Sequence, residues 1–376
     1  MSESSDADLI AGEAAEGPSI NTIPFVFEGK GGEYFGIWIT NIFLTVLTLG
    51  IYSAWAKVRN LRYFYRSTSL DGAHFDFHAN PVAILKGRLI AVAFFILFAV
   101  VSELSPIGGL VLTVVLAFAI PWIIVRALKF RFANTSYRNL RFGFDGSYSG
   151  AMKEYLLMPL LLIPSLGLLW PYIRYRQQRY IVSNARYGRS KAGFTGPWIP
   201  WFIAGVPLVL VVLLGFAVPA IYVAIKLQAA LASGAASAEE TDGEVVINTD
   251  GMEADPFAEM GPIFVLAILA FSLALPYYIV RTRNLLFEAT SIGAHHFEST
   301  MRTFRYIGVV LLNLFIVIFT FGFGIPLAKV IMAKYKAETL TLICEGDLDQ
   351  FVAQEQEAVK ALGEELGEAF DIDIGI

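Results

Sequence analysis

The sequence is poor in charge and in cysteine. Charged residues make up 16% of its 376 residues, compared with about 25% in an ordinary soluble domain. The single cysteine, Cys344, excludes an intramolecular disulfide framework and a cysteine-based metal site. Hydrophobic residues make up 56% of the chain. A chain of this composition cannot hide its apolar surface in water, so the sequence predicts a membrane protein.

The N-terminal residues lack both the basic start and the apolar stretch of a cleavable signal peptide. We expect residues 1–22 to form a disordered acidic N-terminus, residues 23–346 a membrane domain, and residues 347–376 an acidic amphipathic tail. The chain also lacks the phosphate-loop, zinc-protease and serine-hydrolase motifs. The sequence therefore predicts no enzymatic activity and no cofactor.

Long uncharged apolar runs dominate the chain. Most approach or exceed the roughly 20 residues that cross a bilayer as a helix. The runs are 34–56, 89–102, 104–125, 155–173, 192–225, 260–280 and 306–328.

Positive charge is concentrated in five clusters. Of the 28 Lys and Arg residues, only Lys30, Lys226 and Lys360 lie outside these clusters. Because cytoplasmic loops are enriched in Lys and Arg, all five clusters and both termini are predicted to lie in the cytoplasm. Residues 227–261 hold many acidic residues and no Lys or Arg, so this loop is predicted to lie outside. Membrane topology explains the basic clusters, so we expect no nucleic-acid partner.

This distribution leaves two helix pairs, around residues 102–109 and 227–261, as full crossings. The three remaining segments, 34–56, 155–173 and 306–328, are predicted to enter and leave from the cytoplasmic face. Each contains helix-breaking residues deep inside its apolar run. The alternative is that these segments are ordinary kinked helices, which gives seven crossings.

A pattern of apolar run, basic residues and strand recurs five times along the chain. Short stretches with alternating polarity follow the basic residues and predict half-buried strands. These stretches include residues 25–29, 75–78, 142–146 and 339–343. The predicted fold is a polytopic α-helical membrane protein with internal repeats, re-entrant or broken helices, and a small cytoplasmic β layer.

Four arginines recur at one position of this pattern: Arg59, Arg126, Arg176 and Arg281. We predict that they form a ring below the hydrocarbon boundary that binds an anionic ligand or lipid, because an arginine fork binds phosphate or carboxylate with two hydrogen bonds. The alternative is that they anchor helix ends to headgroups or pair with acids such as Glu28 and Asp145.

Two asparagines occupy matching positions inside apolar segments. Asn41 and Asn313 must find hydrogen-bond partners there. Either they bond neighbouring helices, or they line a polar cavity.

Three polar residues alternate with phenylalanines on one predicted strand. His74, Asp76 and His78 would share one face, which suits a divalent metal. The simpler interpretation is a strand with a wet face.

The stretch FEGKGGEYFGIWITNIFLTVLTLGIYSAWAKVRNLRYFYRSTSLDG and the ending EAFDIDIGI resemble the YjgN family of bacterial inner-membrane proteins. The resemblance covers nearly the whole chain after Asn21. It implies a multi-pass protein of the bacterial inner membrane, and it brings no known substrate or catalytic residues.

Three classes of function follow from these observations. Repeats and broken segments favour a transporter or channel for a small or anionic solute. The scarcity of charge inside the crossings suits a lipid-binding or scaffold protein equally well. An intramembrane enzyme is the third class. The expected partner in every case is the lipid bilayer, with anionic phospholipids as the expected lipid.

Overall fold

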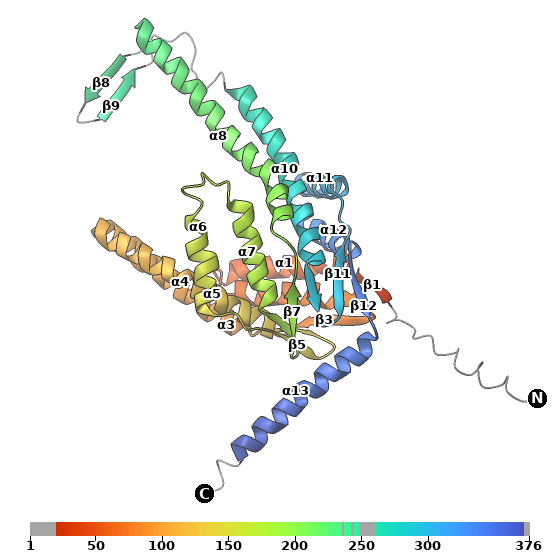
Figure 1. Cartoon of the computed structure of the whole chain (residues 1–376). Helices are drawn as coiled ribbons and strands as arrows, with labels where there is room; N and C mark the ends of the chain where they lie inside the picture. Colours follow the sequence, from red (N-terminus) through yellow and green to blue (C-terminus); the bar gives the residue numbers. More distant parts are fainter. Residues whose placement is uncertain (1–19, 235–236, 242–243, 249–259, 372–376) are drawn as a thin grey trace, which may run out of the picture. The chain divides into compact units, whose positions relative to one another are not determined.

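The computed structural model describes residues 20–234, 237–241, 244–248 and 260–371 (Figure 1). The chain divides into two compact units. The first consists of Met1–Leu160, Ile173–Gly196 and Arg283–Ile376, and the second consists of Leu161–Tyr172 and Pro197–Thr282. The first unit holds a closed β-barrel with its attached helices, and the second holds most of two long apolar helices.

Four helices among the described residues are long and apolar enough to cross a membrane. They are α3 (Pro81–Leu104), α4 (Pro106–Ala133), α8 (Ile199–Ser233) and α10 (Gly261–Glu288). These helices form the two pairs that the charge distribution predicts as crossings. The acidic loop between α8 and α10 lies partly outside the described residues, and its described part contains the strands β8 (Ser237–Thr241) and β9 (Glu244–Asn248).

Helices α3 and α4 form a hairpin, and each begins with a capping side chain followed by proline. The Asn80 side chain accepts a hydrogen bond from the backbone N–H of Val82 at 2.9 Å. Ser105 accepts one from the N–H of Gly108 at 3.2 Å. Proline at the first helical position supports both starts. One residue, Ser105, therefore ends α3 and starts α4.

The three segments with helix-breaking residues are broken in the structure. The helices on either side of the breaks are α1 (Gly31–Leu47) and α2 (Ser53–Arg66), α6 (Met158–Leu160) and α7 (Trp170–Ser183), and α11 (Thr303–Phe319) and α12 (Ile325–Glu338). Each break contains a left-handed residue followed by a left-handed glycine; these pairs are Leu49-Gly50, Leu166-Gly167 and Phe321-Gly322. Whether these segments re-enter the membrane stays a prediction.

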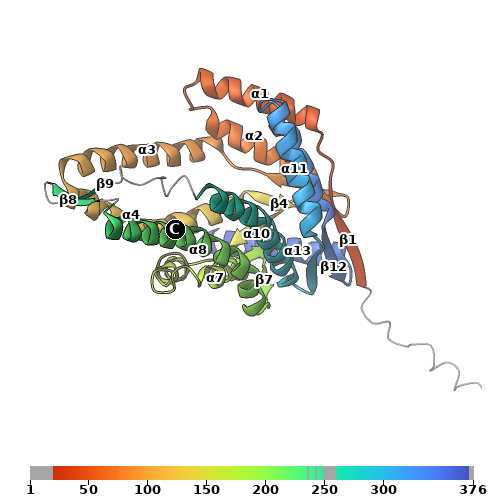
Figure 2. The same ribbon diagram turned by 90° about the horizontal axis from the view of Figure 1, so that it is seen from above.

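The first and last of these hairpins pack together. Helix α1 packs against α2 and α12, and α11 packs against α12 (Figure 2). The ring centroids of Trp38 and Phe323 lie 6.4 Å apart at this contact. The middle segment starts with α5 (Tyr148–Met152) and the π-helix η1 (Lys153–Leu157), which lead into α6.

The strands of the first unit form a closed antiparallel barrel. Their order around it is β1-β12-β11-β10-β7-β6-β5-β4-β3-β2. The strands are β1 (Ile20–Phe27), β2 (Thr68–Leu70), β3 (Ala73–Phe77), β4 (Thr135–Tyr137), β5 (Leu140–Phe144), β6 (Ala185–Tyr187), β7 (Ser190–Phe194), β10 (Thr290–Ile292), β11 (His295–Ser299) and β12 (Leu340–Glu345). Two-residue turns close the hairpins β2–β3, β4–β5, β6–β7 and β10–β11. Asp71 and Gly72 both have positive φ, as such turns require.

Side chains fill the barrel interior. Tyr137 and Tyr187 are buried there, and the Tyr137 hydroxyl donates to the Leu70 carbonyl at 2.8 Å. Burial raises the pKa of Tyr137 to about 12. The final helix, α13 (Leu348–Asp371), starts against this core through Leu348 and Val352 and then leads away from the barrel (Figure 1). A helix therefore forms where the amphipathic tail was predicted.

The predicted strands are present, but they form a closed barrel, which the predicted β layer did not include. The strands form a closed barrel because β1 pairs with β12 on one side and with β2 on the other. Such pairing between the two ends of the chain has no local sequence signature. The internal repeat stays a prediction. The predicted disorder of residues 1–22 falls almost entirely outside the described residues, because β1 begins at Ile20.

Candidate functional site

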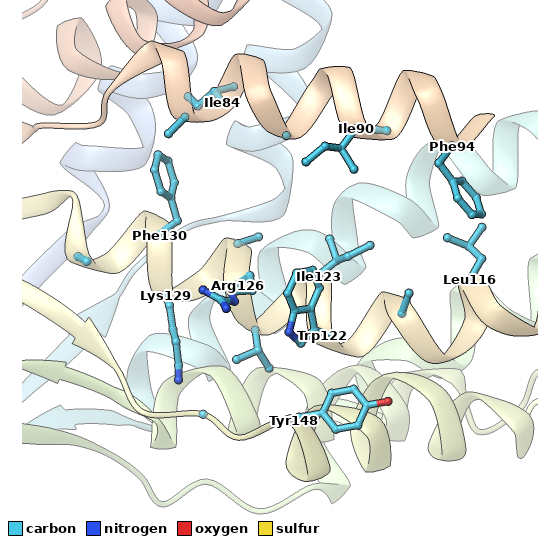
Figure 3. A pocket seen from close by; sticks show the side chains of 18 of the residues that line it. Ile84, Ile90, Phe94, Leu116, Trp122, Ile123, Arg126, Lys129, Phe130 and Tyr148 are labelled. Atoms are coloured by element: carbon cyan, nitrogen blue, oxygen red, sulfur yellow. The ribbon is translucent and has the colours of Figure 1, made fainter. Parts of the chain in front are cut away.

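A large apolar groove lies between α3 and α4 (Figure 3). Its volume is about 1350 Å³, which exceeds the 300–1,000 Å³ typical of small-molecule pockets. The apolar side chains that line it include Ile84, Ile90, Phe94, Val115, Leu116, Ile123 and Phe130. The segment that leads into α5, residues 146–148, lines it as well. The groove therefore suits a long hydrocarbon group.

Small residues on α3 make room for the groove. Ala83, Gly87 and Ala91 all line it and follow one another at intervals of four residues, so they share one face of the helix. A side chain built on Gly87 would meet no atom within 4 Å at its Cβ. The groove therefore has space next to the backbone of α3.

Positive charge gathers in the part of the groove nearer the C-terminus of α4, which we call its mouth. Arg126 and Lys129 both line it from the C-terminal part of α4 and are exposed. The guanidinium carbon of Arg126 lies 5.2 Å from the centroid of the Trp122 ring, a distance at which the cation is attracted to the ring face. Asp and Glu are missing from the set of described residues that line the groove. The site is therefore apolar along its length and cationic at its mouth.

Hydrogen bonds fix the segment beside this mouth. The Tyr148 hydroxyl donates to the Phe118 carbonyl of α4 at 3.0 Å. The Ser147 hydroxyl accepts from the backbone N–H of Gly150 at 3.2 Å and so caps α5. Asn134, which also lines the groove, donates to the Phe130 carbonyl at 2.7 Å. The segment of residues 146–148 is therefore held against α4.

The four predicted arginines occupy different environments. Arg126 lines the groove, whereas Arg59 is exposed, with its guanidinium carbon 6.0 Å from the centroid of the Tyr52 ring. Arg176 donates to the buried carboxylate of Glu154. Arg281 is exposed on α10 in the second compact unit. The predicted ring and its alternative both stay predictions, because the acidic partner of Arg176 lies on the π-helix η1 and is neither Glu28 nor Asp145.

Asn41 is buried on α1 and donates to the Asn60 side-chain oxygen of α2 at 2.9 Å. This bond joins two helices, as one of the two interpretations requires. The side-chain oxygens of Asn41 and Asn313 are buried without a hydrogen-bond partner among the described residues. The predicted polar cavity around them stays a prediction.

His74 and Asp76 lie on β3, and His78 directly follows it. His78 Nδ1 lies 3.9 Å from a carboxylate oxygen of Asp76. Arg66 donates two hydrogen bonds of 2.9 Å to Asp76 and lowers the pKa of its carboxyl. His78 Nε2 lies 2.7 Å from the Ser136 hydroxyl, and His74 Nε2 lies 3.9 Å from a carboxylate oxygen of Glu28. Within the described ranges, no group of three or more His, Cys, Asp or Glu side chains is arranged to hold a metal ion. The metal hypothesis gains no support from this geometry.

The groove was not predicted from the sequence. Recurrence singled out Arg126 as a site residue, but not Lys129 or Trp122. Trp122, Arg126 and Lys129 follow one another at intervals of four and three residues, a spacing that places them on one side of α4. The four-residue interval between Ala83, Gly87 and Ala91 was the available signal for a gap beside α3.

The chain is similar to proteins named inner membrane protein YjgN. The protein of Escherichia coli O157:H7 is 32% identical over 144 residues, which cover 38% of this chain and 36% of that protein. The protein of Salmonella typhimurium is 33% identical over 142 residues, with the same coverage. The matched part thus spans about a third of the length of these relatives. No solved structure matches the chain significantly. A family model described as bacterial protein of unknown function (DUF898) matches residues 22–369, so the chain belongs to that family.

Proposed function

We propose that this chain is a lipid-binding protein of the bacterial inner membrane and that the groove between α3 and α4 holds a hydrocarbon chain of a membrane lipid. The observation that carries the proposal is an apolar groove of about 1350 Å³ whose described lining has its cationic residues in the part nearer the C-terminus of α4. An amphiphile has the same division into a long apolar part and a polar head. The similarity to inner-membrane relatives supports the location.

The length of the groove suits one leaflet of a bilayer. Along α3 the lining runs from Ala83 to Phe95, which corresponds to about 18 Å of helix at 1.5 Å per residue. Along α4 it runs from Val115 to Asn134, about 28 Å, and the part between Val115 and Arg126 is about 16 Å long. One half of a hydrocarbon core is about 15 Å deep. The predicted orientation, with the basic clusters in the cytoplasm, assigns the groove to the cytoplasmic leaflet.

A gap beside a helix in the hydrocarbon region must be filled, since side chains that face empty space lose their dispersion contacts. None of the residues in the most apolar stretch of α3 is buried within the protein. Lipid chains are the apolar groups available there. The contact of apolar side chains with lipid that favours insertion of the hairpin therefore also favours a lipid chain in the groove.

The observations support lipid binding more than transport of a small or anionic solute. A solute path needs polar groups along its length, and the described lining of the groove carries its charge at the mouth alone. The barrel interior is filled by aromatic and aliphatic side chains such as Tyr137, Tyr187 and Leu342. A scaffold role is compatible with lipid binding, and no observation favours an enzyme.

Filling the groove tests this function. In Gly87→Trp, an indole would occupy the space beside α3, and we expect the number of lipids that co-purify with the full chain to fall. Leu89→Trp is the matched control, because Leu89 is an exposed residue of α3 outside the lining. Native mass spectrometry of both variants in the same mild detergent counts the bound lipids. Equal lipid counts in the two variants and the parent would contradict the proposal.

A further inference from the structure

We infer that the groove between α3 and α4 selects lipids with an anionic phosphate headgroup over lipids with a zwitterionic ethanolamine headgroup. The inference rests on the proposed lipid-binding function and adds the chemistry of the headgroup. Its basis is the placement of Arg126, Lys129 and Trp122 at the mouth of the groove.

Two cations share one side of α4 at this mouth. Arg126 and Lys129 are three residues apart, so they lie about one helical turn apart on neighbouring positions. Both are exposed, and neither forms an ion pair with another residue in the part of the chain that the structure describes. Their charges are therefore available to an anion that enters the groove.

A phosphodiester suits these two side chains better than a smaller or softer anion. The planar guanidinium of Arg126 can donate two parallel hydrogen bonds to two phosphate oxygens. The Lys129 ammonium acts as a mobile point charge, and its side chain extends from α4 on the side of the segment that carries Tyr148 (Figure 3). A phosphate between them would be joined to chains that lie along Ile123 and Ile90.

An ethanolamine headgroup would place an additional ammonium next to these like charges. Proteins hold ammonium groups with carboxylates or with the faces of aromatic rings. Asp and Glu are missing from the described lining. The Trp122 ring is already paired with the Arg126 guanidinium at 5.2 Å. The mouth therefore attracts the phosphate of either lipid and repels the ammonium of the zwitterionic one.

Competition between two lipids with identical chains measures this selectivity. The full chain, purified in a neutral detergent and stripped of lipid, is offered equal amounts of phosphatidylglycerol and phosphatidylethanolamine. Native mass spectrometry then gives the ratio of the two bound lipids. We expect about tenfold more phosphatidylglycerol on the parent protein. A ratio near one on the parent would overturn the inference.

Two double variants, one at the mouth and one away from it, test whether the preference for phosphatidylglycerol arises at the mouth. Arg126→Gln/Lys129→Gln is expected to bring the ratio close to one while lipid still binds. The matched control, Arg131→Gln/Lys153→Gln, removes two exposed positive charges from nearby positions outside the lining. It is expected to keep the tenfold ratio. An equal loss of selectivity in both double variants would show that the selectivity comes from the overall positive potential of the protein. That result would contradict the headgroup site.

Inorganic phosphate and Gly87→Trp separate the remaining outcomes. If inorganic phosphate at the concentration of the lipid displaced phosphatidylglycerol, the mouth would be a site for the free ion and the lipid-headgroup inference would be wrong. If Gly87→Trp reduced binding of both lipids while the parent showed no preference, the groove would still bind chains and only the inference would fail. If Gly87→Trp left lipid binding unchanged, the proposed chain site would fail, whatever the ratio.

Discussion

The barrel and the α3–α4 hairpin belong to the same compact unit and treat apolar side chains in opposite ways. In the barrel, Tyr187 is 4% exposed and packs between Phe142 and Phe351. On the hairpin, Leu104 and Phe95 are 80% and 62% exposed. The barrel has a filled core, whereas the hairpin has a groove. The two regions are therefore built for different surroundings.

This difference matches a barrel in water and a hairpin in a bilayer. A barrel in water must remove its apolar side chains from solvent, and this burial stabilises it. Helices in a bilayer gain nothing by hiding leucine from equally apolar lipid tails, so their packing can stay open. A groove on the hairpin therefore costs little stability, whereas a cavity of the same kind inside the barrel would be strongly destabilising.

The sharpest test of this comparison replaces one aromatic residue in each region by alanine. Tyr187→Ala would leave a cavity in the barrel core, and we expect a loss of about 3–5 kcal/mol in unfolding free energy. Phe118→Ala removes an aromatic side chain that is 52% exposed on α4, and we expect a loss of no more than about 1 kcal/mol. Thermal unfolding in detergent measures both. Similar losses in the two variants would break the comparison.

The regular parts of the fold could be predicted from the sequence because they depend on local patterns. Long uncharged runs predicted α4, α8 and α10, the shorter run 89–102 predicted α3, and alternating residues such as Phe75 and Phe77 predicted strands. Closure of the barrel could not be predicted, because it depends on β1 pairing with β12 from the other end of the chain. Local patterns do not encode such a register.

The candidate site was predicted only in part for a related reason. Recurrence singled out Arg126, but the groove also needs the small residues of α3 to face α4. Which residues of two helices face each other depends on the rotation of each helix, and an apolar pattern without a polar face leaves that rotation open. The mouth of the groove therefore became visible only with both helices in place.

A smaller effect is expected where α13 is fastened to the barrel. Arg138 forms ion pairs with Asp71, at 2.6 Å, and with Asp349 of α13. The Arg138 side chain is 19% exposed, and its two acidic partners are 42% and 73% exposed, so water can solvate both acids in Arg138→Gln. We expect a loss of no more than about 1 kcal/mol and faster hydrogen exchange at Leu348 and Val352.

The matched control for the ion pairs of Arg138 is Arg141→Gln, because Arg141 is an exposed residue of β5 in the same barrel. It should leave hydrogen exchange of α13 unchanged. If both variants exchange alike, the start of α13 is held by the apolar contacts of Leu348 and Val352 alone, and the charged fastening has no measurable role.

The smallest expected effect is a dependence of this contact on pH. His295 is buried, and the centroid of its ring lies 4.7 Å from that of Phe351 on α13. Burial lowers the pKa of His295 below its ordinary value of 6.5; nearby Glu345 opposes this shift and His296 adds to it. The unfolded chain therefore binds a proton more readily than the folded one.

It follows that stability falls as the pH drops through about 6.5 toward the lower folded-state pKa of His295. Between pH 7.5 and pH 5, we expect the melting temperature of the parent to fall more than that of His295→Gln, which has no titrating group at this position. His74→Gln is the control, since His74 is an exposed residue of β3. If His295→Gln and His74→Gln show the same pH dependence as the parent, protonation of His295 at the contact between β11 and α13 does not affect stability.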